Sequence, residues 1–428
     1  MSVQPQVTTR RGLTTVGAIL VALLVCGLVG TPPARAATTG LRVADGRLVE
    51  ANGRDLVLRG INHAYTWYPG RTGTFAAIKA AGANSIRLSL AIGRRWKPAS
   101  TAADLAAAVA LCKQNRLICV LDAHDTMGYG QQAGAASMDQ AVDYWLAVRS
   151  ALVGQENYVI LNIADEPFGY KRDMTWTRDT MRAIGRLRAA GFRHTLMVDG
   201  PDWGQDEFFT MRDNAPKVLA SDPARNVLFD VHMYGVFHTP AKVRAYLQSF
   251  VDRRLPLVVG EFSDNHPYGK PAVDAILAYC QRYRLGFLGW SWSGNTEAAY
   301  LDMVRDFDPA LRTPWGVRFL SGVNGLQANA REASVFGADG AGAPDGTAPR
   351  GRWTWPDLWS WSLARATAVR AFPAWPASPA AAGVSPSAPH LAAAVKPGDT
   401  VTRTGDVATR PAAVRVTPRR AAWAFAPR

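Results

Sequence analysis

The feature that most constrains the fold is a repeated alternation of two kinds of segment between residues 56 and 294. Short apolar runs rich in β-branched residues recur eight times, and segments with the 3.6-residue period of an amphipathic helix separate them. Eight such units predict an α/β fold in the form of a parallel (β/α)8 TIM barrel. The expected strands are residues 56–63, 83–90, 117–124, 158–167, 194–201, 226–235, 255–262 and 285–292.

A doubly wound open sheet is the competing architecture for alternating strands and helices. Its usual mark is a G-x-G-x-x-G motif after the first strand, and the residues that follow the 56–63 run contain none. Ahead of the barrel, residues 41–58 hold Asp-Gly and Asn-Gly turns between short alternating runs. These turns indicate a short N-terminal β-hairpin that closes the barrel floor.

The N-terminal residues 1–36 have the composition of a signal peptide. The paired Arg10 and Arg11 precede an apolar run over residues 16–29, and the small-residue motif Ala-Arg-Ala ends the segment at 36. A membrane anchor is the alternative, but it needs an apolar run of ~20 residues. We therefore expect a secreted, extracellular protein with no membrane contact after cleavage. The paired arginines favour the twin-arginine export route, and the general secretory route is the alternative.

Residues 339–428 form a Pro/Ala-rich, low-complexity tail that lacks Ile, Asn and Tyr. We expect this tail to be disordered and assign it no function. Its Trp residues leave open a remnant of a carbohydrate-binding module, and its composition leaves open an out-of-frame translation. Residues 37–338 then make up the catalytic domain.

The formal net charge of +14 is concentrated in these two ends. The middle of the chain is only weakly basic, whereas nucleic-acid binding needs a concentrated basic face. We therefore expect no nucleic-acid partner.

Three cysteines remain after the predicted signal peptide, which carries Cys26. Cys112 and Cys119 flank a tight turn, so a disulfide between them is one possibility in an oxidising compartment. Three inert buried thiols, with Cys280 as the third, are the other. The spacing matches no metal site.

Reactive side chains gather at the carboxyl ends of the expected strands, where the function of a parallel barrel resides. They are Asn62, His63, Arg87, His124, Asp125, Asp165, Glu166, Trp203, His232, Tyr234, Glu261 and Trp290. Two of them, Glu166 and Glu261, end the fourth and seventh strands, which face each other across an eight-stranded barrel. A carboxylate pair ~5–5.5 Å apart suits glycoside hydrolysis with retention of configuration. Proximity of like charges keeps one member protonated as the general acid.

Several motifs together resemble glycoside hydrolase family 5 of clan A, and within it the secreted bacterial endo-β-1,4-mannanases. The resemblance covers residues 40–337 and is carried by "RGINHAYTWYP", "CVLDAHDTMGYGQ", "VILNIADEPFG", "DVHMY", "GEF" and "LGWSWSGN". It implies a retaining mechanism with Glu166 as acid/base and Glu261 as nucleophile. It further implies that Arg87 and His124 orient the nucleophile and the sugar, and that His232 and Tyr234 form hydrogen bonds near the nucleophile. Trp290 would be a stacking platform for the sugar, and Trp203 a substrate-binding wall.

One position departs from the family pattern, which has Asn before the acid/base where this chain has Asp165. An Asn amide donates to the sugar 2-hydroxyl, whereas an ionised Asp only accepts and adds negative charge near the two glutamates. We expect Asp165 either to be protonated or to shift the pH optimum and lower the turnover.

The resemblance predicts hydrolysis of internal β-1,4-mannosidic bonds of mannan, glucomannan or galactomannan by a monomer without a cofactor. A retaining hydrolase of cellulose or xylan is the first alternative, and a catalytically impaired barrel that binds polysaccharide is the second. The acidic residues Asp302, Asp306 and Asp308 are explained by a solvated loop, with Ca²⁺ binding as the alternative.

Overall fold

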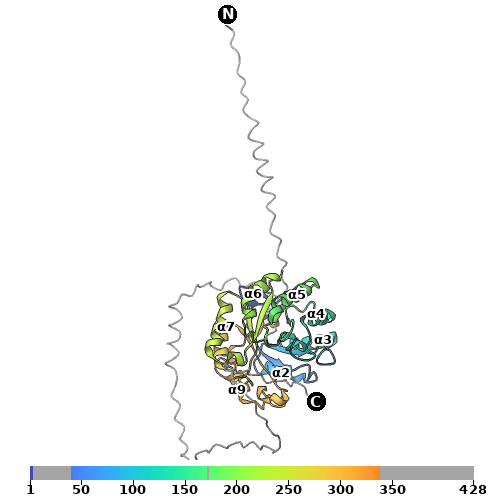
Figure 1. Cartoon of the computed structure of the whole chain (residues 1–428), viewed down its shortest axis with the longest axis vertical. Coiled ribbons are helices and arrows are strands. Elements are labelled where there is room, and N and C mark those ends of the chain that lie inside the picture. Colours follow the sequence, from blue (N-terminus) through green and yellow to red (C-terminus); the bar gives the residue numbers. More distant parts are fainter. Residues whose placement is uncertain (3–39, 171–172, 338–428) are drawn as a thin grey trace, which may run out of the picture. The chain divides into compact units, whose positions relative to one another are not determined.

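The computed structural model describes residues 1–2, 40–170 and 173–337 (Figure 1). Apart from residues 1 and 2, the predicted signal peptide and tail lie outside the described residues. None of the helices in the described part of the chain is long and apolar enough to span a membrane.

Eight parallel strands close into a barrel in the order β10-β3-β4-β5-β6-β7-β8-β9, which confirms the predicted (β/α)8 fold. They are β3 (Arg59–His63), β4 (Ser85–Leu90), β5 (Ile118–Ala123), β6 (Val159–Asn162), β7 (Thr195–Asp199), β8 (Val227–His232), β9 (Leu257–Glu261) and β10 (Gly286–Gly289). The strands are almost wholly buried because one face points into the barrel and the other packs under helices. The observed strands are shorter than the expected ones, most of all β6, which ends before the acids at 165 and 166.

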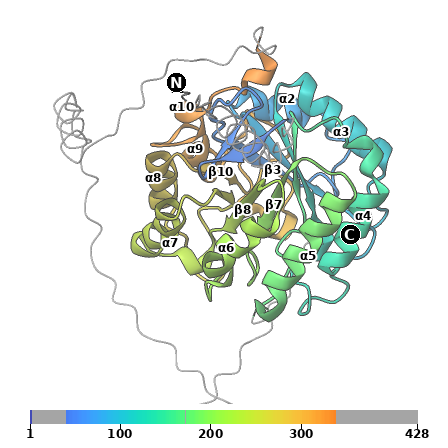
Figure 2. The same ribbon diagram turned by 90° about the horizontal axis from the view of Figure 1, so that it is seen from above.

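The helices form a ring outside the strands, as Figure 2 shows from above. They are α2 (Gly73–Ala80), α3 (Ala102–Gln114), α4 (Met138–Ala147), α5 (Trp176–Ala189), α6 (Thr210–Ser221), α7 (Pro240–Asp252), α8 (Val273–Tyr283), α9 (Pro314–Ser321) and α10 (Leu326–Asn329). Local sequence fixes where several of them begin. Thr101 and Ser137 cap α3 and α4 in reciprocal capping boxes, and Pro240 occupies the first turn of α7 after its cap.

The predicted hairpin is present and closes the barrel floor. Strands β1 (Arg42–Ala44) and β2 (Arg47–Val49) pair in antiparallel fashion around Asp45 and Gly46, whose φ angles are +48° and +74°. Leucines from the hairpin and the segment after it pack against side chains at the centre of the barrel, in one buried cluster. This cluster comprises Leu41, Leu48, Leu56, Leu58, Ile118, Val120, Ile160, Met197, Leu228, Val258, Leu288 and Ala333.

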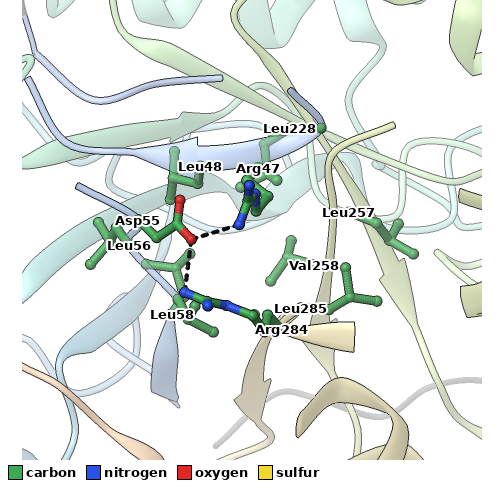
Figure 3. Close-up of a pocket in the computed structure, with 13 residues that line it drawn as sticks. Arg47, Leu48, Asp55, Leu56, Leu58, Leu228, Leu257, Val258, Arg284 and Leu285 are labelled. Carbon is green, nitrogen blue, oxygen red and sulfur yellow. Dashed lines mark hydrogen bonds and ion pairs between the residues drawn. The ribbon is translucent and has the colours of Figure 1, made fainter. Parts of the chain in front are cut away.

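Figure 3 shows the edge of this floor, where a small cavity of about 20 Å³ lies between the hairpin and the first residues of β8, β9 and β10. Asp55 bridges Arg47 at 2.8 Å and Arg284 at 2.7 Å. The floor is therefore sealed by apolar packing and surface ion pairs, and the chemistry of the barrel is confined to the opposite end.

All three cysteines of the described residues are buried and free, so the structure has the thiol alternative rather than the disulfide. Cys112 of α3 and Cys119 of β5 lie within hydrogen-bonding reach, and burial raises the pKa of Cys112. Burial likewise raises the pKa of Cys280 to about 12. Such thiols behave as small hydrophobic residues.

Candidate active site

Arg87 is the centre of the site at the carboxyl ends of the strands. Its guanidinium is fully buried, and it donates to Glu261 Oε1 at 2.5 Å and to Asp165 Oδ1 at 2.6 Å. It also donates to Asn62 Oδ1 at 3.0 Å and to Asn162 Oδ1 at 2.8 Å. A rigid planar fork suits this task because it fixes several acceptors in one plane. Side chains from β3, β4, β6 and β9 are thereby held in one arrangement.

Glu261 is the last residue of β9, and both its oxygens have a donor. Arg87 binds Oε1, and the Tyr234 hydroxyl donates to Oε2 at 3.0 Å. The β8–β9 register shifts between Val231 and His232, which brings His232 opposite Glu261. The carboxylate is thus fixed in position and stabilised in its charged form.

Glu166 lies four residues beyond the end of β6 with a φ of +40°. Its backbone N–H donates to Asp199 Oδ2 at 3.0 Å, and its Oε1 contacts His232 Nδ1 at 2.9 Å. One oxygen of Glu166, one of Glu261 and one ring nitrogen of His232 all lie within 4.8 Å of one another. That spacing is compatible with the ~5–5.5 Å between carboxyl groups of a retaining pair and too short for the ~6.5–9.5 Å of an inverting pair.

The two carboxyl groups differ in their electrostatic surroundings. Burial raises the pKa of Glu166 to about 8; the His232 hydrogen bond opposes the rise, and the charges of Asp165 and Glu261 add to it. Burial also raises the pKa of Glu261, but the positive charges of His232 and Arg87 oppose this rise. Arg87 binds Glu261, and this arrangement favours the proton on Glu166 and the negative charge on Glu261.

The contacts of Asp165 favour its ionised form over the protonated form that the sequence also allowed. Its Oδ1 accepts from Arg87 at 2.6 Å, and its Oδ2 lies 3.1 Å from His124 Nδ1. Burial opposes ionisation, but the positive charges of His124 and Arg87 outweigh it and lower the pKa of Asp165. The added negative charge is therefore balanced within the site. The expected effect on the pH optimum and turnover stays a prediction.

The two histidines carry positive charge. Burial disfavours the charged form of His124, but Asp165 and Asp122, the latter 2.9 Å away, raise its pKa to about 9. Burial also opposes the charge of His232, yet Glu261 and the surrounding carboxylates raise its pKa well above the ordinary value. His232 Nε2 lies 3.5 Å from Asp199 and 3.6 Å from Asp230. The two histidines thus place positive charge beside the buried carboxyl groups of the site.

Asp122, Asp199 and Asp230 are functional-site residues that the sequence reasoning missed. Each is a single acid in an otherwise apolar strand, in "VLDAH", "MVDGP" and "FDVHM", and each is fully or almost fully buried. A charge within a strand buried on both faces must be paired inside the barrel, so this interruption was a readable signal. Two glycines leave room for this network. A Cβ at Gly260 would lie 1.9 Å from Asp230, and a Cβ at Gly204 would lie 2.6 Å from His232.

Aromatic side chains surround the dyad. Trp290 stacks on His124 with ring centres 5.8 Å apart, and its indole N–H donates to Asn295 Oδ1 at 2.9 Å. Trp67 and Trp96, which the sequence reasoning did not single out, each lie 5.4 Å from His124. They follow β3 and β4 in "YTWYP" and "RRWKP", so their place after a strand was the available signal. Glu166, Glu261, His124, Tyr234 and Trp290 line one common pocket.

Trp203 lies on the β7–α6 loop, and its indole N–H donates to Gln131 Oε1 at 3.0 Å. The backbone approaches it closely, because a Cβ at Gly128 would lie 2.4 Å from its ring. This tryptophan is outside the pocket that holds the dyad.

Two residues of the expected rim serve packing instead. His63 is fully buried among Tyr65, Phe75 and Phe307, and burial lowers its pKa to about 3, so it is neutral. Asp125 Oδ2 accepts from the backbone N–H groups of Arg94 and Arg95 at 2.6 and 2.9 Å, which shapes the loop after β4.

In the acidic loop considered for Ca²⁺, Asp302 is engaged by hydrogen bonds from its own chain. Asp302 Oδ1 accepts from the backbone and side chain of Asn295 at 3.1 and 2.5 Å. Three groups of acidic and imidazole side chains converge within 4.8 Å among the residues that the structure describes, and none of them includes Asp302, Asp306 or Asp308. All three groups belong to the charge network around Arg87 and His232.

Comparisons with known proteins agree with this geometry. The model of the family "Cellulase (glycosyl hydrolase family 5)" matches residues 49–296. A mannan endo-1,4-beta-mannosidase from Streptomyces lividans is 50% identical over 375 residues, which cover 84% of this chain and 96% of that protein.

Solved structures give the same result. A β-mannanase from Thermomonospora fusca is 51% identical, with a TM-score of 0.69 over 70% of this chain and 100% of that one. A mannohexaose complex of the T. fusca enzyme is 50% identical, with a TM-score of 0.68 and the same coverage. Sequence, closed barrel and paired carboxylates together show that the chain belongs to glycosyl hydrolase family 5, a family of retaining glycoside hydrolases.

Proposed function

We propose that the protein is an endo-β-1,4-mannanase that cleaves internal β-1,4-mannosidic bonds of mannan, glucomannan or galactomannan with net retention of configuration. The observation that carries the proposal is that an oxygen of Glu166 and an oxygen of Glu261 lie within 4.8 Å of each other at the mouth of the barrel. The choice of mannan is supported by the relatives, because the S. lividans protein is named a mannan endo-1,4-beta-mannosidase and the T. fusca enzyme binds mannohexaose.

In the first step, Glu166 donates its proton to the glycosidic oxygen while a Glu261 oxygen attacks the anomeric carbon. The bond to the leaving sugar breaks and a covalent glycosyl–enzyme ester forms. A pKa of about 8 keeps Glu166 protonated at neutral pH, as this step requires. Arg87 and Tyr234 hold the Glu261 carboxylate ready for the attack.

In the second step, Glu166 accepts a proton from water, and that water attacks the anomeric carbon and releases Glu261. Two inversions give net retention. Trp290 offers an aromatic face to the C–H surface of the sugar that is attacked, beside Glu261 in the same pocket. The chemistry uses two carboxyl groups and water.

Reducing-sugar release tests the proposal on glucomannan, galactomannan, carboxymethyl-cellulose and xylan. We expect release from the two mannans, and its complete loss in Glu261→Ala. Glu332→Gln is the matched control, because Glu332 pairs with Lys79 and Arg116, remote from the dyad network. Activity mainly on cellulose would favour the first alternative, which the description of the family model also supports. No hydrolysis by a folded protein would contradict the proposal.

We propose further that the protein is exported and that residues 1–36 are removed. The paired arginines, the apolar run and the Ala-Arg-Ala motif support this, and they fall outside the described residues apart from positions 1 and 2. N-terminal sequencing of the protein from culture medium should begin at Ala37. Recovery of the full chain in the cells alone would contradict export.

A further inference from the structure

The exposed aromatic side chains of the described residues all lie on one side of the barrel. They are Tyr129, Tyr170, Phe208, Phe209, Tyr268 and Tyr300. Each one lies on a loop that follows the carboxyl end of a barrel strand, after β5, β6, β7, β9 or β10. A single exposed aromatic residue needs no explanation, but their restriction to the catalytic end indicates a binding surface.

Two of them, Tyr170 and Phe208, form a pair across two loops. Tyr170 is 42% exposed and Phe208 46% exposed, and their ring centres lie 5.6 Å apart at 51°. Gln131 links the backbone of Tyr170 to Trp203, because its Oε1 accepts from the Tyr170 backbone N–H at 2.8 Å and from the Trp203 indole at 3.0 Å. The contact is tight, since a Cβ at Gly169 would lie 2.6 Å from Gln131. The backbone that carries Tyr170 is therefore tied to the Trp203 side chain through Gln131.

This pair lies near the proposed general acid along a short, hydrogen-bonded segment. Tyr170 is four residues from Glu166, a separation of at most about 14 Å along the chain. The Glu166 carbonyl accepts from Gly128 at 3.0 Å, and the Gly169 N–H donates to the Tyr129 carbonyl at 3.0 Å. The segment after the general acid is thus tied to the loop after β5.

A second aromatic group comes from different loops. Trp67, Trp96 and Trp290 follow β3, β4 and β10 and surround His124, beside Glu261. Trp290 thus lines the pocket that holds both glutamates, whereas Tyr170 lies on the segment that follows the general acid. Because the general acid protonates the departing oxygen, aromatic side chains beside the segment that follows Glu166 are suited to contact the leaving part of the substrate.

We propose that Tyr170 and Phe208 form a sugar-binding platform for the leaving-group half of the polysaccharide, beyond the sugar that contacts Glu166. This inference rests on the proposed function. A β-1,4-linked pyranose chain is uncharged and presents apolar C–H faces, which suit two exposed rings better than hydrogen-bonding groups would. An enzyme that cleaves inside long chains would use this platform to bind the part of the polysaccharide that leaves.

The test compares kcat/KM of Tyr170→Ala, Phe208→Ala and Tyr170→Phe on galactomannan and on an aryl β-mannobioside. The aryl group is too short to extend past Glu166 to the pair. We expect each Ala variant to lose roughly three- to tenfold on galactomannan, the effect of one aromatic contact, and nothing on the aryl substrate. Tyr170→Phe keeps the ring and should match the wild type on both substrates.

Unchanged cleavage of galactomannan by both Ala variants would overturn the platform while leaving the proposed function intact. An equal loss on both substrates would also overturn it, because the effect would then reach Glu166 itself. Failure of the proposed function is distinguished by the wild type, which would cleave neither mannan substrate, and the platform would fall with it. Melting temperatures of the variants, together with the aryl substrate, report on correct folding.

Discussion

Asp165→Asn tests the electrostatic balance of the site. Asp165 contacts Arg87 at 2.6 Å and His124 at 3.1 Å, and its charge helps to raise the pKa of His124 to about 9. Asparagine keeps the shape and one acceptor oxygen but removes the charge. We expect a lower pKa of His124 and a lower pKa of Glu166, because Asp165 raises both.

The magnitude follows from Coulomb's law. Unit charges 3.1 Å apart interact by about 5 kcal/mol at an effective dielectric constant of ~20. That energy corresponds to roughly four pKa units. It is an upper bound, since Asp122 stays 2.9 Å from His124 in the variant. We therefore predict that the pKa of His124 falls from about 9 to below roughly 7.

Two assays measure these effects. Histidine NMR as a function of pH gives the pKa of His124, and the pH dependence of kcat shows where the general acid deprotonates. The alkaline limb, set by Glu166 with a pKa of about 8, should move to lower pH in the variant. At its optimum, kcat should rise by roughly tenfold, because the new amide can donate to the sugar 2-hydroxyl in the transition state.

Asp55→Asn is the matched control, since Asp55 also pairs with two arginines but lies at the barrel floor. It should change neither the His124 titration nor the pH profile. If Asp165→Asn left the pKa of His124 near 9 and the profile of kcat unchanged, the electrostatic argument would be wrong.

Three further predictions address single residues. Glu166→Gln should raise the melting temperature more at pH 8 than at pH 5. The pKa of Glu166 is about 8 in the native protein and 4.5 ordinarily, so the stability of the wild type falls as the pH rises between these values. Equal shifts in melting temperature at both pH values would contradict this. Tyr234→Phe removes the donor to Glu261 and should lower kcat roughly 10- to 100-fold, and a change below twofold would exclude the hydrogen bond as important. Gly260→Ala places a Cβ 1.9 Å from Asp230 and should cost about 1–3 kcal/mol in urea unfolding, whereas unchanged stability would mean that the strand adjusts freely.

The barrel was predictable because its strands are buried on both faces and therefore read as apolar runs of similar length. The hairpin was predictable for a different reason, since Asp45-Gly46 favours the positive φ angles that the turn adopts. The end of β6 was placed too late, because Ile163 and Ala164 continue the apolar run although the strand ends at Asn162.

Within the site, Glu166 and Glu261 were found from their position at strand ends, but their protonation was not. The charge of Asp165 depends on two cations that come from β4 and from the segment after β5, far away in sequence. Burial and the neighbouring Asp230 raise the pKa of Asp199, and these surroundings exist only when the barrel closes. Sequence patterns indicate which side chains point into a barrel, whereas the sum of their charges requires the distances.

The measurement that tests the central claim most directly is the configuration of the glycosyl azides formed when azide rescues Glu166→Ala and Glu261→Ala. If Glu261 is the nucleophile, azide attacks the glycosyl–enzyme of Glu166→Ala from the opposite face and gives the β-azide. In Glu261→Ala, azide takes the place of the missing carboxylate and gives the α-azide. The account predicts this pair of products, and the reverse pair would show that the two glutamates have exchanged roles.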